Sequence, residues 1–114
     1  MTVSQLATLL DATTVNEYDF SRSVDEGYAG DLLSFVMGRA PENAAWFTVM
    51  TNVNVAAVAV LTDVAVVVLC EDCHADETLV ERSKTQHVNV IATSLPVYKA
   101  IAKVCQSKVY GNAD

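Results

Sequence analysis

The chain has 114 residues, of which 52% are apolar and 18% are charged, so it can bury a core and is too apolar for intrinsic disorder. Fourteen acidic against seven basic residues give a net charge of −7, which excludes strong electrostatic binding to a nucleic-acid backbone. We therefore expect residues 1–114 to form a single domain that does not bind nucleic acid.

The charges are unevenly distributed along the chain. Residues 1–81 hold thirteen acidic and two basic residues, whereas residues 82–114 hold five basic residues and one acidic residue. The basic third forms either a solvated helix face or a contact with an acidic partner or a second copy.

The first ten residues lack the basic and apolar pattern of a signal peptide, and Thr62 and Asp63 interrupt the longest apolar stretch. We expect a cytoplasmic protein without a membrane span.

The first third of the chain contains short elements. Residues 2–5 read Thr-Val-Ser-Gln, a capping box that predicts a helix to about residue 10. Residues 13–16 predict a brief strand, and residues 18–28 a strand or loop that leads into an irregular turn over residues 27–30. Asp31 is then expected to cap a helix that ends near residue 39.

From residue 45 onward strands and helices alternate regularly. The strands begin about 20 and 23 residues apart and each is followed by a helix, which indicates parallel strands joined by crossover helices. The expected fold is therefore a three-layer α/β fold, with a mostly parallel sheet and helices on both faces. The expected strands are residues 45–50, 65–69 and 88–92, and the helices are residues 53–61, 77–84 and one from Pro96 onward.

Three of these helices carry further expectations. Thr51 and Asn52 are expected to cap the helix over residues 53–61, and Thr93 and Ser94 the last helix, whose apolar positions run from Val97 to Val109. The helix over residues 53–61 is apolar almost all round, although a strand is an alternative there. Such a helix needs cover on several sides, which a second copy of the chain provides most naturally, so we expect a homodimer.

Two segments resemble a known family. The run over residues 24–34, Val-Asp-Glu-Gly-Tyr-Ala-Gly-Asp-Leu-Leu-Ser, and the segment Ala-Trp-Phe-Thr over residues 45–48 are similar to the DRTGG domain family, especially small stand-alone members found near iron-only hydrogenase genes. The resemblance continues through residues 54–59 and the last strand and helix. Residues 24–30 occupy the place of the five-residue string that names the family.

The resemblance implies a fold like the amino-terminal domain of HPr kinase/phosphorylase and the middle region of some phosphotransacetylases. It implies regulation, dimer contact or ligand sensing, and a possible protein partner in a hydrogenase-type system. It does not imply kinase activity, because the chain has no Gly-x-x-x-x-Gly-Lys-Ser/Thr loop to hold a triphosphate.

The string Cys70-Glu-Asp-Cys73-His74 is the most suggestive chemical motif. Its spacing fits haem attachment, a redox pair or part of a metal site, and Cys70, Cys73 and His74 are the candidate ligands. Glu71 and Asp72 oppose thiolate formation, and a second cysteine pair is missing, so free thiols in a turn are the favoured interpretation. We expect no cofactor.

A ligand site is expected where parallel strands end, because loops and helix amino termini converge there. The candidate binding residues are Gly27, Gly30, Asp31, Thr51, Asn52, Thr93 and Ser94. The leading hypothesis is a non-enzymatic regulatory domain that homodimerises and binds a nucleotide or anion. The alternatives are a metal-binding or thiol redox protein of a hydrogenase-type system, and a degenerate enzyme acting on phosphorylated metabolites.

Overall fold

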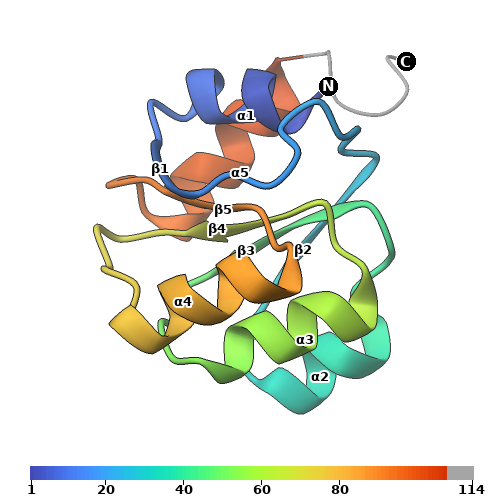
Figure 1. The fold of residues 1–114 in the computed structure, drawn as a ribbon. Coiled ribbons are helices and arrows are strands. Elements are labelled where there is room, and N and C mark those ends of the chain that lie inside the picture. Colours follow the sequence, from blue (N-terminus) through green and yellow to red (C-terminus); the bar gives the residue numbers. More distant parts are fainter. Residues whose placement is uncertain (108–114) are drawn as a thin grey trace.

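The computed structural model describes residues 1–107 and contains one five-stranded sheet with the strand order β1-β5-β4-β3-β2 (Figure 1). Strands β2 to β5 are parallel, and β1 lies antiparallel beside β5. The strands are β1 (Thr13–Asn16), β2 (Glu26–Ala29), β3 (Ala44–Thr48), β4 (Val66–Leu69) and β5 (Val90–Ala92).

Helices cover both faces of this sheet, as Figure 1 shows. The helices are α1 (Val3–Leu9) and α5 (Val97–Gln106) on one face, and α2 (Leu33–Arg39), α3 (Asn54–Thr62) and α4 (Glu77–Gln86) on the other. The predicted three-layer α/β fold is therefore confirmed. Within residues 1–107 no helix has the length and apolar character needed to cross a membrane.

The central strands separate two hydrophobic cores. Every residue of β3 and β4 is buried, as expected for parallel strands that are covered on both faces. Along β3 the side chains alternate: Ala45 and Phe47 pack in the cluster beneath α1 and α5, whereas Trp46 packs in the cluster with α2, α3 and α4. The apolar run that predicted a buried strand thus supplies both cores.

Helix α3 is covered mostly by its own chain. Its buried positions, Val55, Ala56, Val58 and Ala59, belong to the core that also contains residues of the sheet, α2 and α4. The helix prediction is confirmed and the strand alternative is wrong. The argument that a second copy is needed as cover is also wrong, because the helix layer supplies that cover. Among the residues of α3, those on the side that faces away from the core are exposed to solvent, and Leu61 is 72% exposed.

The amino-terminal capping box is confirmed. The Thr2 hydroxyl accepts a hydrogen bond from the Gln5 amide at 3.1 Å, and the Thr2 amide donates to Gln5 Oε1 at 2.9 Å. The predicted turn over residues 27–30 is wrong, because residues 26–29 form strand β2 in register with β3. Pairing with a fully buried neighbour strand outweighs the turn preference of the two glycines.

Two further capping predictions are wrong, because tertiary partners take the side chains. Helix α2 starts without a side-chain cap, and Asp31 instead binds β3. Helix α5 has Pro96 at its N-cap, while the Thr93 hydroxyl donates to the Leu10 carbonyl at 2.9 Å. Val109, which was expected to continue the apolar face of this helix, lies outside the described residues.

Candidate functional site at the carboxyl ends of the strands

The candidate binding residues fall into two separate groups at the carboxyl ends of the strands. Asp31, Thr51 and Asn52 lie near the ends of β2 and β3, and Thr93 and Ser94 follow β5. Gly27 lies within β2 itself and Gly30 follows it directly, so neither forms the irregular loop that was expected to contact a ligand.

The group at β2 and β3 is a closed structural network. The Asp31 carboxylate accepts from the buried Thr48 hydroxyl at 2.7 Å and from the Val49 amide at 3.0 Å. The Trp46 indole donates to the Gly30 carbonyl at 2.9 Å. These bonds fasten the chain after β2 to β3, so Asp31 and Gly30 hold the fold together at this point.

Thr51 and Asn52 also make local contacts. Asn52 Oδ1 accepts from the Asn54 amide at 2.9 Å, which supports the turn that leads into α3. The Thr51 carbonyl accepts from the Asp76 amide at 3.0 Å, and the Thr51 hydroxyl donates to the Asp76 carboxylate at 3.4 Å. The two bonds between Thr51 and Asp76 therefore join the segment before α3 to the start of α4.

The group at β4 and β5 surrounds a cavity of about 170 Å³. Three connections contribute to it: the one between α1 and β1, the one between β4 and α4, and the one between β5 and α5. Asp11 and Thr13 were missed by the sequence reasoning, because nothing local indicates that β1 lies beside β5. The lining residues are Asp11, Thr13, Asp72, Cys73, His74, Ala92, Thr93 and Ser94.

A left-handed turn forms one wall of this cavity. Glu71 and Asp72 have φ values of 64° and 59°, and the Cys73 amide donates to the Cys70 carbonyl at 3.2 Å across them. The Glu71 amide donates to the Leu95 carbonyl at 2.9 Å, and the Asp72 amide to the Thr93 carbonyl at 3.1 Å. This turn therefore holds the loop after β4 against the loop after β5, although left-handed angles are unfavourable for a residue such as Glu71.

The cysteine motif does not assemble a reactive centre. Cys70 is fully buried in the core beneath α1 and α5, and all three cysteines are free thiols. Burial, followed by the nearby Glu71 carboxylate, raises the pKa of the Cys70 thiol to about 11, so the thiolate that metals and disulfides require is disfavoured. Among the described residues no group of three or more His, Cys, Asp and Glu side chains is placed to hold a metal ion.

The charge of the cavity favours some ligand groups over others. The acidic residues Asp11 and Asp72 are among its lining residues, and its described lining includes no lysine or arginine. A bare phosphate is repelled by such a lining, whereas neutral hydrogen-bond donors and cations are attracted. Thr13, Ser94 and His74 also line the cavity, and the Thr13 hydroxyl donates to the Ala92 carbonyl at 3.4 Å.

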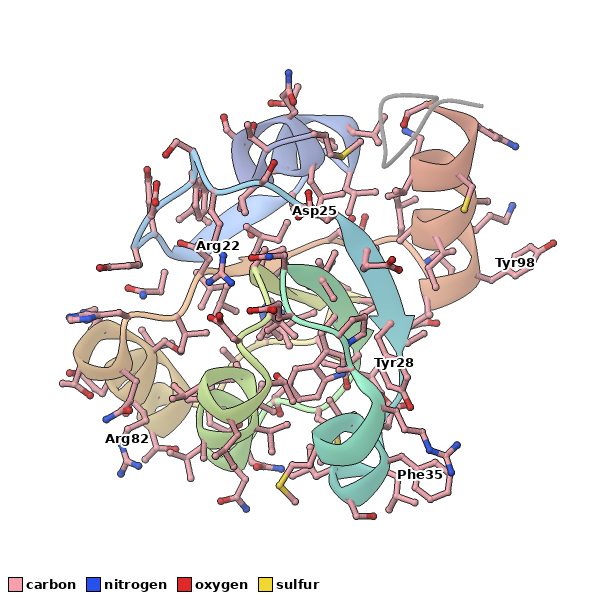
Figure 2. All side chains as sticks on the ribbon, turned by 90° about the vertical axis from the view of Figure 1, so that its right-hand side faces the viewer. Arg22, Asp25, Tyr28, Phe35, Arg82 and Tyr98 are labelled. Atoms are coloured by element: carbon pink, nitrogen blue, oxygen red, sulfur yellow. The ribbon has the colours of Figure 1, made fainter. Side chains whose placement is uncertain are left out.

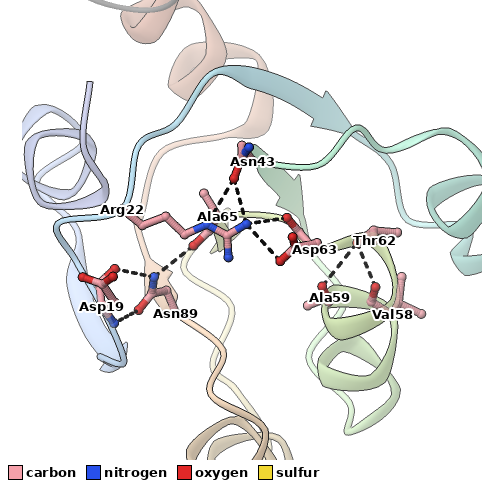
Figure 3. Close-up of polar contacts among 9 residues, drawn as sticks. All are labelled: Asp19, Arg22, Asn43, Val58, Ala59, Thr62, Asp63, Ala65 and Asn89. Atoms are coloured by element: carbon pink, nitrogen blue, oxygen red, sulfur yellow. Dashed lines mark hydrogen bonds and ion pairs between the residues drawn. The ribbon is translucent and has the colours of Figure 1, made fainter.

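The opposite end of the strands carries a polar network that the sequence reasoning missed (Figure 3). Asn89 is 4% exposed. Its side-chain nitrogen donates hydrogen bonds to the backbone carbonyls of Asp19 and Ala65, and its side-chain oxygen accepts hydrogen bonds from the backbone amides of Tyr18 and Asp19. Arg22 donates to Asn43 and Asp63, with an ion pair of 3.0 Å to the Asp63 carboxylate. Asn89 thus uses its full hydrogen-bonding capacity, which marks this network as structural.

The fold and the cavity together define a small three-layer α/β domain with an acid-lined cavity at the carboxyl ends of two parallel strands. No protein-family model matches the chain, and no curated protein matches it either.

Among solved structures, the chain is similar to a crystal structure of the CBS and DRTGG domains of the regulatory region of Clostridium perfringens pyrophosphatase, complexed with its activator diadenosine tetraphosphate. The two share 13% sequence identity with a TM-score of 0.72, over 93% of this chain and 46% of that chain. The chain thus spans about half the length of its structural neighbour. At this identity the likeness shows the fold alone, and it supports the predicted DRTGG-like domain.

Proposed function

We propose that this chain is a non-catalytic regulatory domain that binds a small ligand in the cavity at the ends of β4 and β5 and acts as a homodimer. The observation that carries the proposal is the origin of the cavity lining in three separate connections of the chain. A ligand that contacts all three connections couples the edge strand β1 to α4 and α5. Ligand binding thereby changes the stability of a large part of the sheet.

The structural neighbour supports a regulatory role. That neighbour is the regulatory region of a pyrophosphatase in complex with a nucleotide activator, and this chain has a similar fold over 93% of its length. We extend that description to this chain as a proposal. A role in sensing requires a folded scaffold and a binding site, and the cavity at the ends of β4 and β5 is the site that we propose.

The cavity limits which part of a ligand it accepts. Its volume of about 170 Å³ is below the roughly 300 to 1,000 Å³ of pockets that enclose whole drug-sized ligands. We therefore propose that a nucleoside or amine part of the ligand enters the cavity next to Asp11 and Asp72, and that any phosphate group stays outside, where water and counterions neutralise it.

A thermal-shift screen tests this proposal. The panel contains adenosine, ATP, diadenosine tetraphosphate, acetyl phosphate and spermidine, so that neutral, anionic and cationic compounds are compared. A ligand at one hundred times its Kd stabilises the folded state by about 2.7 kcal/mol, which is easily seen as a rise in Tm. We expect a nucleoside-containing or cationic compound to give the largest rise.

Three variants locate the binding site. Asp72→Asn keeps a residue type that tolerates the left-handed backbone but removes one charge, and Ser94→Ala removes a hydroxyl from the rim. Both should raise the apparent Kd of the ligand at least about threefold. The ligand then stabilises the folded state by about 0.7 kcal/mol less, and the rise in Tm is smaller. Ser34→Ala, at an exposed position of α2, is the matched control and should leave it unchanged. A panel without any stabilising compound, or equal shifts in all variants, contradicts the proposed site.

A further inference from the structure

Another cavity lies at the amino ends of the strands, beside the polar network of Figure 3. Its volume is about 110 Å³. A water molecule takes up roughly 30 Å³, so the cavity has room for a few waters or for one small polyatomic ion. Three segments line it: Arg22 in the connection between β1 and β2, the end of α3 with the residues up to 65, and residues 86–89 before β5. A ligand there contacts parts of the chain that are far apart in sequence.

Arg22 lines this cavity and has unused hydrogen-bond donors. Its side chain is 29% exposed and turns toward the body of the molecule, whereas Arg82 on α4 projects from the surface (Figure 2). Nε and Nη2 donate to Asn43, and Nη2 also donates to the carbonyl and the carboxylate of Asp63. Nη1 has no acceptor within residues 1–107, and in Figure 3 it points away from Asn43. Two of the five N–H groups of the guanidinium therefore have no partner in the described part of the chain.

Two side chains at the end of α4 also line the cavity, and their polar atoms have no hydrogen-bond partner among the described residues. Gln86 is the last residue of α4, and His87 follows it with a φ of 63°. The His87 ring stacks on the Tyr18 ring, with the centroids 4.6 Å apart and an angle of 11° between the planes, so the imidazole is held in place. The Gln86 amide and a neutral imidazole both offer N–H donors. The end of α4 thus presents further donors beside Arg22.

The charges at the cavity decide which ligand fits. Arg22 forms an ion pair of 3.0 Å with Asp63, whose side chain is 61% exposed, so the two charges cancel and water screens the carboxylate. Nη1 of Arg22 can only donate, so it requires an acceptor, and hydrogen bonds from arginine to carboxylates and phosphates are strengthened by charge. The ends of α3 and α4 carry partial negative charge, which weakens the binding of an anion. We therefore expect a small oxyanion to bind with a Kd on the order of 1 mM.

From these observations we infer that the cavity binds a small oxyanion, such as inorganic phosphate or a carboxylate, through Nη1 of Arg22 with Gln86 and His87 as further donors. The inference goes beyond the proposed function, because this site lies at the opposite end of the strands and takes a different class of ligand. The oxyanion links the loop before β2 to the ends of α3 and α4. Its binding therefore adds to the stability that the network of Asn89 and Arg22 gives to this end of the sheet.

A phosphate titration of the nitrogen-15-labelled full-length chain, followed by NMR, tests the inference. Sodium phosphate is raised to about 50 mM at about pH 7, and the reference sample contains sodium chloride of the same ionic strength, so that screening is matched. We expect the amide signals of residues 63–65 and 86–89 to shift and to saturate with a Kd on the order of 1 mM, while those of residues 11–13 and 72–74 stay unchanged. AMP and acetate, titrated in the same way, distinguish the phosphate group of a larger molecule and a carboxylate from the free phosphate ion.

Two glutamine variants locate the oxyanion. Gln86→Ala and Gln106→Ala change the same residue type at the last position of α4 and of α5, and both glutamines are exposed. Gln86→Ala should raise the Kd for phosphate at least about threefold, whereas Gln106→Ala should leave it unchanged. Arg22→Lys keeps the charge but loses the Nη1 donors, so it should abolish saturable binding. Should Arg22→Lys not fold, the two glutamine variants decide.

The inference is overturned if the wild type shows no saturable shifts, if the chloride reference reproduces them, or if they are concentrated at residues 11–13 and 72–74. Equal Kd values for the two glutamine variants also overturn it, because the oxyanion then lies elsewhere. Binding of AMP at residues 63–65 and 86–89 as tight as that of phosphate supports the inference and extends the ligand to phosphate groups of larger molecules. Binding of acetate at the same residues extends it to carboxylates.

Discussion

The amino ends and the carboxyl ends of the strands use polar residues in opposite ways. At the amino ends, Asn89 and Arg22 bind the surrounding loops, and the bonds of Asn89 leave none of its polar atoms for a ligand (Figure 3). At the carboxyl ends of β4 and β5, polar side chains surround a cavity of about 170 Å³. The comparison supports the proposal that the polar residues at the amino ends hold the fold together, whereas those around the cavity at the ends of β4 and β5 bind a ligand.

The largest effect is expected at the amino ends. Asn89→Ala removes the four hydrogen bonds of a buried amide and leaves the Ala65 carbonyl without this donor, so it should lower the free energy of unfolding by about 3 kcal/mol. Urea unfolding measures the change. Asn54→Ala, at an exposed position of α3, is the control and should change it by less than about 0.5 kcal/mol. Similar effects for the two variants would show that the amino-end network is dispensable.

The carboxyl ends of β2 and β3 should behave like the amino ends. Asp31→Ala deprives the buried Thr48 hydroxyl and the Val49 amide of their acceptor, and should lower the free energy of unfolding by about 2 kcal/mol. Asp25→Ala, at an exposed position just before β2, serves as the control. If Asp31→Ala is as stable as the control and loses ligand binding instead, Asp31 belongs to the binding site.

These networks also explain how far the sequence could predict the fold. The buried strands from residue 44 onward are continuous apolar runs, and the sequence alone located them within about two residues. Strand β2 was predicted only in part, as the end of a strand or loop over residues 18–28, because Gly27 and Gly30 indicated a turn there. Asp31 and Thr93 were misassigned as caps, since their partners Thr48 and Leu10 are distant in sequence.

The candidate site could be predicted only in part. Topology placed a site at the carboxyl ends of the strands, and Cys73, His74, Thr93 and Ser94 do line one cavity there. The contribution of Asp11 depends on the position of β1 beside β5, which no local pattern encodes. The sequence suggested a site for a nucleotide or an anion, whereas Asp11 and Asp72 in the cavity lining favour a neutral or cationic group.

The reactivity of the cysteines should distinguish Cys70, which lies in the core, from Cys73, which lines the cavity. The raised pKa of Cys70 means that the folded state holds this proton more tightly than the unfolded state does. Stability should therefore fall as pH rises from about 9 to about 11, and Cys70→Ala should reduce that fall.

In a thiol-labelling experiment at neutral pH, Cys73 and Cys105 should react quickly and Cys70 slowly. Rapid labelling of all three thiols in the folded protein would contradict the burial of Cys70.

The smallest effect is expected at the rim of the cavity. Ser94 is exposed and lies outside the hydrogen-bond networks, so Ser94→Ala should change the free energy of unfolding by less than about 0.5 kcal/mol in the absence of ligand. A loss above about 1 kcal/mol in urea unfolding would mean that the rim is structural like the amino ends.

Amide hydrogen exchange with and without each compound of the screening panel tests the central claim most directly. A stabilising compound should slow exchange around residues 11–13, 70–74 and 93–94, which border the cavity, more than around residues 18–22 and 87–89 at the opposite end. Slower exchange concentrated at the amino ends, or the same change throughout the chain, would contradict the assignment of the carboxyl ends as the responsive part of the molecule.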